Sequence, residues 1–333
     1  MRFLWLALLI TPARADLPDL VEAHEKAVRA VRFAKDYFAT TDGKIVMLWD
    51  AGTRKQIRVL ETEFKILGIR FAPGRPLLAV YGYDDKGGVT ALFEANQPGW
   101  RKTVRAEHPV FDIAFSPDAK RIATATAGRY AKRIPEGETE PGAVTIWTTS
   151  DAARVVSFPV SGRSVAWSSD GKTIAAADGS RIRLLNVKEK THFAINDITA
   201  PRRFSGLRAV SCSPKEPLLA YLVTVNTRRM SWLVQLKALS EKGTAIERPS
   251  IGGRDRIHDL SFSPDGSLLA GIGNNKLHMF DLKKSEPRTV SLAWERRPIS
   301  ASCFAFTAAS KEIAVGRYDG TVRFARIADL AAE

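Results

Sequence analysis

The stretch FDIAFSPDAKRIATA, from Phe111 to Ala125, contains the pattern that decides the fold. An apolar run that ends in an aromatic residue is followed by Ser-Pro-Asp, which is typical of a tight turn, and then by a second apolar run. The same arrangement returns in VAWSSDGKTIAAAD from Val165 and in LSFSPDGSLLAGIG from Leu260. Because self-similarity of this kind is the signature of a repeat architecture, we expect the chain to be built of repeats.

Four weaker copies complete a series of seven, beginning at Val31, Ile69, Val210 and Phe304. We call the last residue before each turn the anchor. The anchors are Phe33, Phe71, Phe115, Trp167, Cys212, Phe262 and Phe306, and they are spaced by 38, 44, 52, 45, 50 and 44 residues. These spacings match one four-stranded propeller blade of roughly 40–45 residues, with loops that absorb the excess.

A third strand follows in most copies. After a turn that contains Gly or Asn, alternating apolar residues run to Asp50, Glu94, Trp147, Asn186, Asp281 and Ile327. Asp-Gly flanked by such residues is the strongest short-range signal of a β-hairpin. The sequence therefore predicts an all-β chain made of hairpins.

The repeats resemble those of the WD-repeat (WD40-like) β-propeller family, and the likeness runs from about Leu17 to Ile327. The resemblance implies a single domain, residues 16–333, folded as a seven-bladed β-propeller of four-stranded antiparallel sheets. In that family the chain start supplies the outer strand of the last blade, and LVEAH, which ends in His24, stands in the place of such a strand. Closure by this N-terminal strand would leave no exposed sheet edge.

The sequence also departs from the family pattern. The buried network of His, Ser/Thr, Asp and Trp that the family often carries is expected mainly in the first blade, from His24, Thr40, Asp42 and Trp49. Elsewhere the Trp position holds Phe93, Phe280 or Ala325, so apolar packing is expected there. The turn-and-strand pattern is also similar to the propellers of periplasmic translocation proteins and of prolyl-peptidase caps, which stay open as alternative subfamilies.

Residues 1–15, MRFLWLALLITPARA, are typical of a signal peptide. Arg2 is basic, an apolar core follows, and the small residues Ala13 and Ala15 stand where a signal peptidase cleaves. We expect an exported protein, periplasmic or secreted, although an ordinary apolar N-terminal strand is the alternative. No other stretch approaches the roughly 20 apolar residues of a membrane helix, so no transmembrane segment is expected.

The whole chain carries 50 Lys and Arg against 36 Asp and Glu. Without Arg2 and Arg14 the mature chain keeps 48 basic residues, so its net charge is 48 − 36 = +12. This charge favours an anionic partner. Nucleic acid is not expected, because an exported protein rarely meets it and no recognised reading module is present.

Motifs of catalysis are missing from the sequence. The five His are dispersed, and neither Cys lies at metal-ligand spacing from a His. The sequence has no phosphate loop and no nucleophile elbow. We therefore predict no metal, no cofactor and no enzyme. Asp112 and Asp259 share one register, three residues before their anchors, where an inner strand faces the central channel. They would bind a cation or perform acid–base chemistry, or else accept hydrogen bonds from neighbouring backbone amides.

Three successive connections into inner strands are rich in arginine. If blades five to seven are neighbours, these arginines share one sector of a single face, and loops between second and third strands add others. The predicted partner-binding residues are Arg202, Arg203, Arg228, Arg229, Arg254, Arg256, Arg296, Arg297 and Arg317, with Trp294 for stacking. We call this set the arginine face. Guanidinium groups bind carboxylate, sulfate or phosphate, although a solvated basic surface without a ligand is the alternative.

These features favour a monomeric, non-catalytic scaffold that binds an acidic protein or peptide through the arginine face. The long polar loop between Gly128 and Gly142 is expected to contribute to recognition, or else to be a tolerated insertion. Two other functions remain open at this point. One is the binding of acidic glycans or envelope polymers, and the other is a hydrolase or lyase with its site at the channel mouth.

Overall fold

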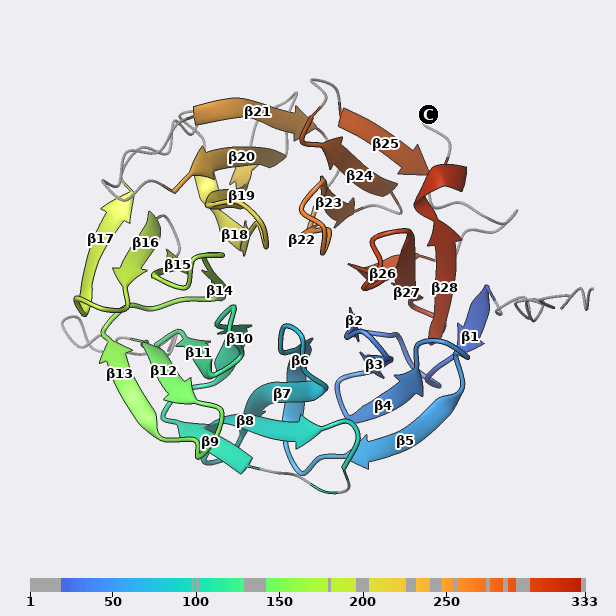
Figure 1. Ribbon diagram of the computed structural model, residues 1–333, viewed down its shortest axis with the longest axis horizontal. Helices are drawn as coiled ribbons and strands as arrows, with labels where there is room; N and C mark the ends of the chain where they lie inside the picture. Colours follow the sequence, from blue (N-terminus) through green and yellow to red (C-terminus); the bar gives the residue numbers. More distant parts are fainter. Residues whose placement is uncertain are drawn as a thin grey trace, which may run out of the picture.

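The seven repeats fold into seven four-stranded antiparallel sheets around a common axis, as Figure 1 shows for the computed structural model. Each sheet forms because turn residues reverse the chain between short apolar strands. The structure describes residues 19–97, 99, 102–128, 142–178, 181–195, 204–225, 232–239, 247–253, 257–273, 276–283, 287–291 and 300–330. The predicted all-β, seven-bladed propeller is confirmed.

Each blade runs from an inner strand at the axis to an outer strand at the rim (Figure 1). Blade one is β2 (Ala30–Phe33), β3 (Tyr37–Thr41), β4 (Ile45–Asp50) and β5 (Gln56–Glu61), and blade two is β6 (Lys65–Phe71), β7 (Leu77–Asp84), β8 (Gly87–Glu94) and β9 (Lys102–Ala106). Blade three is β10 (Val110–Phe115), β11 (Arg121–Thr126), β12 (Val144–Thr148) and β13 (Arg154–Phe158), and blade four is β14 (Ser164–Trp167), β15 (Thr173–Asp178), β16 (Arg181–Asn186) and β17 (Thr191–Ile195).

The remaining blades follow the same order. Blade five is β18 (Phe204–Cys212), β19 (Leu218–Val225), β20 (Trp232–Ala238) and β21 (Glu247–Gly253), and blade six is β22 (Asp259–Phe262), β23 (Leu268–Gly273), β24 (Lys276–Asp281) and β25 (Pro287–Ser291). Blade seven is β26 (Ala301–Phe306), β27 (Glu312–Arg317), β28 (Thr321–Arg326) and β1 (Leu20–Glu22).

The Ser-Pro-Asp turns are held by their own side chains. In blade three, the Ser116 hydroxyl donates to the Asp118 carboxylate at 2.6 Å and accepts from the Arg121 amide at 3.0 Å. The Ser116 hydroxyl and the Lys120 amide hold the pKa of Asp118 below its usual range. Blades four and six repeat this arrangement, which explains why the motif recurs in the sequence.

The core consists of seven apolar clusters, and each lies between two neighbouring blades. Between blades three and four, for example, Ala123 and Ile146 pack with Val165 and Trp167. Both faces of a blade are therefore buried, which explains apolar residues on both sides of the inner strands. The seventh contact, between blades seven and one, closes the ring.

The chain start closes the last blade, as predicted. Strand β1 pairs antiparallel with β28, with Val21 opposite Val322, and the two strands lie side by side in Figure 1. The His24 amide donates to the Gly320 carbonyl at 2.9 Å. Gly320 has φ +87°, and a Cβ there would lie 1.8 Å from the His24 carbonyl oxygen. Only glycine allows this close approach.

The polar network expected in blade one centres on Thr40. Its hydroxyl oxygen lies 2.9 Å from His24 Nε2 and accepts a hydrogen bond from Trp49 Nε1 at 3.0 Å. Burial lowers the pKa of His24, so its imidazole is neutral near pH 7. Asp42 does not hydrogen-bond to these side chains. Its carboxylate accepts hydrogen bonds from two backbone amides of its own hairpin turn.

Two features were missed in the sequence. Trp147 Nε1 donates to Thr124 Oγ1 at 3.0 Å, so blade three repeats the Trp–Thr contact of blade one. Strand β20, the third strand of blade five, has no Asp-Gly or Asn-Gly turn before it and was not predicted. The other six third strands are β4, β8, β12, β16, β24 and β28, as expected.

Among the residues that the structure describes, no helix has the length and hydrophobicity of a membrane span. The proposed signal peptide, residues 1–15, lies outside the described residues, and so does most of the long loop, residues 129–141.

We predict that Val21→Asp destabilises the ring much more than Leu20→Asp does. Val21 is 6% exposed within the closing cluster, whereas Leu20, on the other face of the same strand, is 45% exposed. A charge at Val21 should lower the free energy of unfolding by about 3 kcal/mol, and at Leu20 by under about 1 kcal/mol. Urea denaturation followed by circular dichroism measures both, and equal losses would contradict closure by β1.

Candidate functional site

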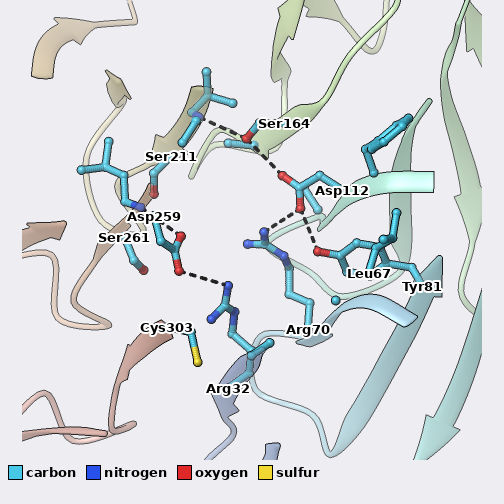
Figure 2. Close-up of a pocket in the computed structure, with 18 of the residues that line it drawn as sticks. Arg32, Leu67, Arg70, Tyr81, Asp112, Ser164, Ser211, Asp259, Ser261 and Cys303 are labelled. Atoms are coloured by element: carbon cyan, nitrogen blue, oxygen red, sulfur yellow. Dashed lines mark hydrogen bonds and ion pairs between the residues drawn. The ribbon is translucent and has the colours of Figure 1, made fainter. Parts of the chain in front are cut away.

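The inner strands of all seven blades enclose a cavity of about 480 Å³ on the axis of the ring. Strand alternation directs the residues one and three positions before each anchor toward this cavity. The residues three before the anchors are Ala30, Gly68, Asp112, Ser164, Ala209, Asp259 and Cys303, and all of them line it. Those one before the anchors that line it are Arg32, Arg70, Ala114, Ala166, Ser211 and Ser261. Most are small, and four are charged, and Figure 2 shows these four side chains in the cavity wall.

Asp112 is the hub of the polar contacts in the cavity wall. It is 8% exposed, and its Oδ1 accepts from Arg70 Nη2 at 2.9 Å and from the Tyr81 hydroxyl at 3.3 Å. Its Oδ2 accepts from the Ser164 hydroxyl at 3.1 Å and from the Val165 amide at 2.9 Å. The carboxylate thereby joins blades two, three and four.

The protonation states around Asp112 follow from this geometry. Burial lowers the pKa of Arg70, but the Asp112 carboxylate, together with Tyr81 and Asp259, outweighs burial, so the pKa is raised. Burial and the same carboxylate raise the pKa of Tyr81. The arginine is therefore charged and the phenol neutral throughout the physiological range.

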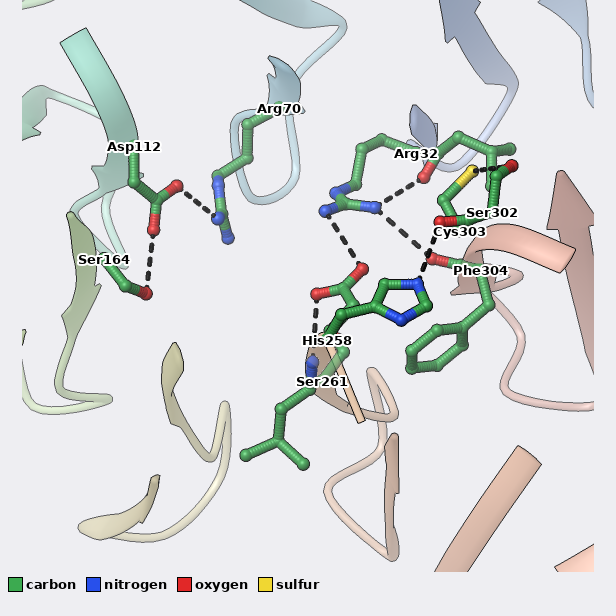
Figure 3. A network of polar contacts seen from close by, with 12 residues as sticks. Arg32, Arg70, Asp112, Ser164, His258, Ser261, Ser302, Cys303 and Phe304 are labelled. Atoms are coloured by element: carbon green, nitrogen blue, oxygen red, sulfur yellow. Dashed lines mark hydrogen bonds and ion pairs between the residues drawn. The ribbon is translucent and has the colours of Figure 1, made fainter. Parts of the chain in front are cut away.

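A second ion pair lies on the other side of the cavity, between Arg32 and Asp259 (Figure 2). Figure 3 shows Arg32 beside Phe304 and apart from Arg70 and Asp112. Arg32 Nη2 is 3.7 Å from Asp259 Oδ2, while Nη1 donates to the Val31 carbonyl at 2.8 Å and to the Phe304 carbonyl at 3.3 Å. The Leu260 amide donates to Asp259 Oδ1 at 2.9 Å. This pair is looser than Arg70–Asp112, because its oppositely charged atoms lie beyond hydrogen-bond distance.

Two of the roles considered for Asp112 and Asp259 can now be compared. Both carboxylates accept hydrogen bonds from backbone amides and face an arginine, as the hydrogen-bonding interpretation expects. Among the described residues, no group of three or more His, Cys, Asp or Glu is arranged to hold a metal ion. The Asp112 oxygens accept hydrogen bonds from an arginine, two hydroxyl groups and two backbone amides, so few lone pairs remain there for a cation.

The two cysteines, Cys303 and Cys212, both line the cavity. Burial raises the pKa of Cys303 to about 11, and burial raises the pKa of Cys212 to about 12. Both thiols are free and belong to β26 and β18, in non-adjacent blades. A thiol protonated at neutral pH is a weak nucleophile.

The cavity wall carries more positive than negative charge. It contains four arginines, Arg29, Arg32, Arg70 and Arg163, but only two aspartates. Arg29 and Arg163 are exposed and lie on connections into inner strands, four residues before their anchors. The Arg163 guanidinium lies 5.1 Å from the centre of the Phe111 ring, which orients it at the cavity mouth.

Most of the predicted arginine face lies outside the described residues. This applies to Arg202, Arg203, Arg228, Arg229, Arg254, Arg256, Arg296, Arg297 and Trp294. The structure corrects the assignment of Arg317, because this residue, at the end of β27, is only 4% exposed. Its guanidinium lies 3.9 Å from Asp319, so it serves the blade rather than an external partner.

Sequence reasoning missed Arg32 and Arg70. The signal for them was present, since both occupy the position directly before an anchor, where the other five repeats hold Ala or Ser. A charged residue at a position where the other repeats hold small residues does not fit in the apolar core between blades. It is therefore expected to point toward the central axis.

Comparison with known proteins supports the fold. No family model matches the chain. No curated protein matches it either. A solved chain of hydrazine synthase from Kuenenia stuttgartiensis is similar, with a TM-score of 0.69 over 92% of this chain and 97% of that chain. The likeness concerns the fold alone. At 15% sequence identity it carries no activity across, and 1445 solved chains match this widespread architecture.

We predict that Asp112→Ala costs more stability than Asp259→Ala, although both occupy the same register. The first leaves the Arg70 guanidinium and the buried Val165 amide without their acceptor, and should lower the free energy of unfolding by about 2–4 kcal/mol. The second removes a looser and more exposed pair, worth under about 1 kcal/mol. Urea denaturation compares the two variants, and a larger loss for Asp259→Ala would contradict the role of Asp112.

We predict slow alkylation of both thiols in the folded protein. At pH 8, a thiol with a pKa near 11 is about 0.1% thiolate, so iodoacetamide should react over 100-fold more slowly than in guanidinium chloride. Mass spectrometry resolves each site, and Cys212→Ser isolates Cys303. Rapid labelling of native Cys303 would show that it is activated.

Proposed function

We propose that this protein is an exported, non-catalytic β-propeller of the WD-repeat type that binds an acidic protein or peptide on one face of its ring. The observation that carries the proposal is the charge balance at the axis. The two carboxylates of the cavity wall each face an arginine and accept hydrogen bonds from backbone amides, and two further arginines give the wall an excess of positive charge.

The topology places these two further arginines on the face that we propose for binding. Arg29 and Arg163 stand on connections from an outer strand to the next inner strand, in blades one and four. By sequence position alone, the residues of the arginine face, now without Arg317, fall between outer and inner strands of blades five to seven and between β19 and β20. All these connections open on the same side of a propeller, so their charges add.

A non-catalytic role is supported by the chemistry of the described cavity. Asp112 and Asp259 are engaged, and Cys303 is held as a thiol. General acid–base or nucleophilic catalysis needs a group whose pKa lies near the working pH. Cys303, whose pKa burial raises to about 11, does not meet that need.

The test is charge reversal on one face, with an equal reversal on the other. The triple variant Arg202→Glu, Arg254→Glu, Arg296→Glu alters the arginine face. The control, Lys55→Glu, Lys188→Glu, Lys283→Glu, alters exposed residues in loops between third and fourth strands, on the opposite side. Biolayer interferometry with immobilised poly-glutamate should show binding that the first triple weakens at least about tenfold and the control leaves within about twofold.

Heparin, as an acidic polysaccharide, is the second probe. Stronger binding to heparin than to poly-glutamate, lost in the arginine triple, would replace the protein partner by an acidic glycan. Equal weakening by both triples would mean that only net charge matters, which would overturn the assignment of this face.

A further inference from the structure

Arg32 and Arg70 occupy the same register in neighbouring blades, and this places two positive charges together at the axis. Both lie directly before an anchor, in β2 and β6, and both line the cavity. Figure 2 shows their side chains extending into the cavity between Asp112 and Asp259. Two like charges in one small space are unfavourable unless acceptors surround them.

The acceptors that the protein supplies are incomplete. A guanidinium has five N–H donors. Arg70 uses Nη2 for Asp112, and its Nε is buried without a hydrogen-bond partner. Arg32 uses Nη1 for two carbonyls, while its Nη2 faces Asp259 beyond hydrogen-bond distance. Both side chains also stay 26% and 35% exposed toward the cavity, so further acceptors can reach them.

The opposite wall of the cavity leaves room for such an acceptor. At the position that holds Arg32 and Arg70, four of the other blades line the cavity with Ala114, Ala166, Ser211 and Ser261. These residues are small, and the two serines add hydroxyl groups that both donate and accept hydrogen bonds. A cavity of about 480 Å³ falls within the size of ordinary small-molecule sites, roughly 300–1,000 Å³.

The chemistry of the wall selects the kind of anion. A planar carboxylate matches the fork of a guanidinium and accepts two parallel hydrogen bonds. A compact phosphate dianion would place its whole negative charge beside the negative charges of Asp112 and Asp259, which is unfavourable. A ligand with separated carboxylates would instead divide its charge between Arg32 and Arg70 inside and Arg29 and Arg163 at the mouth. These two levels are three residues, or about 10 Å, apart along a strand.

We infer that the central cavity binds a small organic acid with two or three carboxylates, and that Arg32 and Arg70 are its principal ligands. The ligand accepts hydrogen bonds from N–H groups of Arg32 and Arg70 that do not bond to Asp112 or Asp259. This site is separate from the arginine face, and it does not depend on the nature of a macromolecular partner.

Isothermal titration calorimetry with citrate, succinate, phosphate and sulfate tests the inference on the full chain. Citrate and succinate should bind, and phosphate and sulfate should bind at least about tenfold more weakly. Arg32→Gln and Arg70→Gln should each weaken citrate binding at least about tenfold. Arg154→Gln, on the exposed outer strand β13, is the matched control and should change binding by less than about twofold.

A second variant covers the case in which Arg70→Gln unfolds the protein. Ser211→Leu keeps both arginines and fills the cavity from the opposite wall, so it should abolish citrate binding. Circular dichroism verifies that each variant is folded. The triple variant of the arginine face should keep its citrate affinity, which separates this site from the proposed partner surface.

Three results would overturn the inference. The first is the absence of heat with either acid up to about 10 mM, a concentration at which even millimolar affinity is visible and which would leave water as the occupant. The second is phosphate binding as tight as citrate binding. The third is loss of citrate binding in the triple variant but not in Arg32→Gln, which would place the anion site on the face.

Discussion

The pairing of β1 with β28 is the constraint on which the rest of the structure depends. Each blade is apolar on both faces and is buried only by its neighbours, so every sheet needs a sheet on either side. The contact between blades seven and one brings Val21 and Ala23, from the chain start, against Val28 and Val31 of the first blade and Phe324 near the chain end. Once this contact forms, the inner strands face a common axis, and the edges that remain are short ones at the axis and at the rim.

Polar contacts around the axis complement the apolar clusters between the blades. One series runs from Arg70 in blade two through Asp112 and Ser164 to the Val210 amide in blade five. A second joins blades six, seven and one, because Arg32 contacts Asp259 and Phe304, and Ser302 bonds to the Val28 carbonyl. Both series cross blade boundaries. The charges at the axis therefore link sheets that are far apart in sequence, and their positions depend on closure of the ring.

Local chemistry explains what could be predicted from the sequence. The Ser116–Asp118 turn and the Asp-Gly hairpins act over a few residues, so strand order and blade number follow from short motifs. Strand β20 lacked such a motif and was missed. The Arg32–Asp259 pair joins residues more than two hundred positions apart, so only the closed ring reveals it. Arg317 was placed correctly near a turn, but its burial against Asp319 depends on packing that no sequence pattern contains.

The differences between equivalent positions carry more functional information than the fold, which very many chains share. Directly before the anchor, five repeats hold Ala or Ser and two hold Arg; three before it, five hold small residues and two hold Asp. Small residues evidently suffice for an inner strand of this ring. Ion pairs at a partly buried site add little stability compared with well-packed small or apolar residues. Folding alone therefore does not account for both arginines at the axis. A ligand that completes the hydrogen bonds of Arg32 and Arg70 gives them a physical reason.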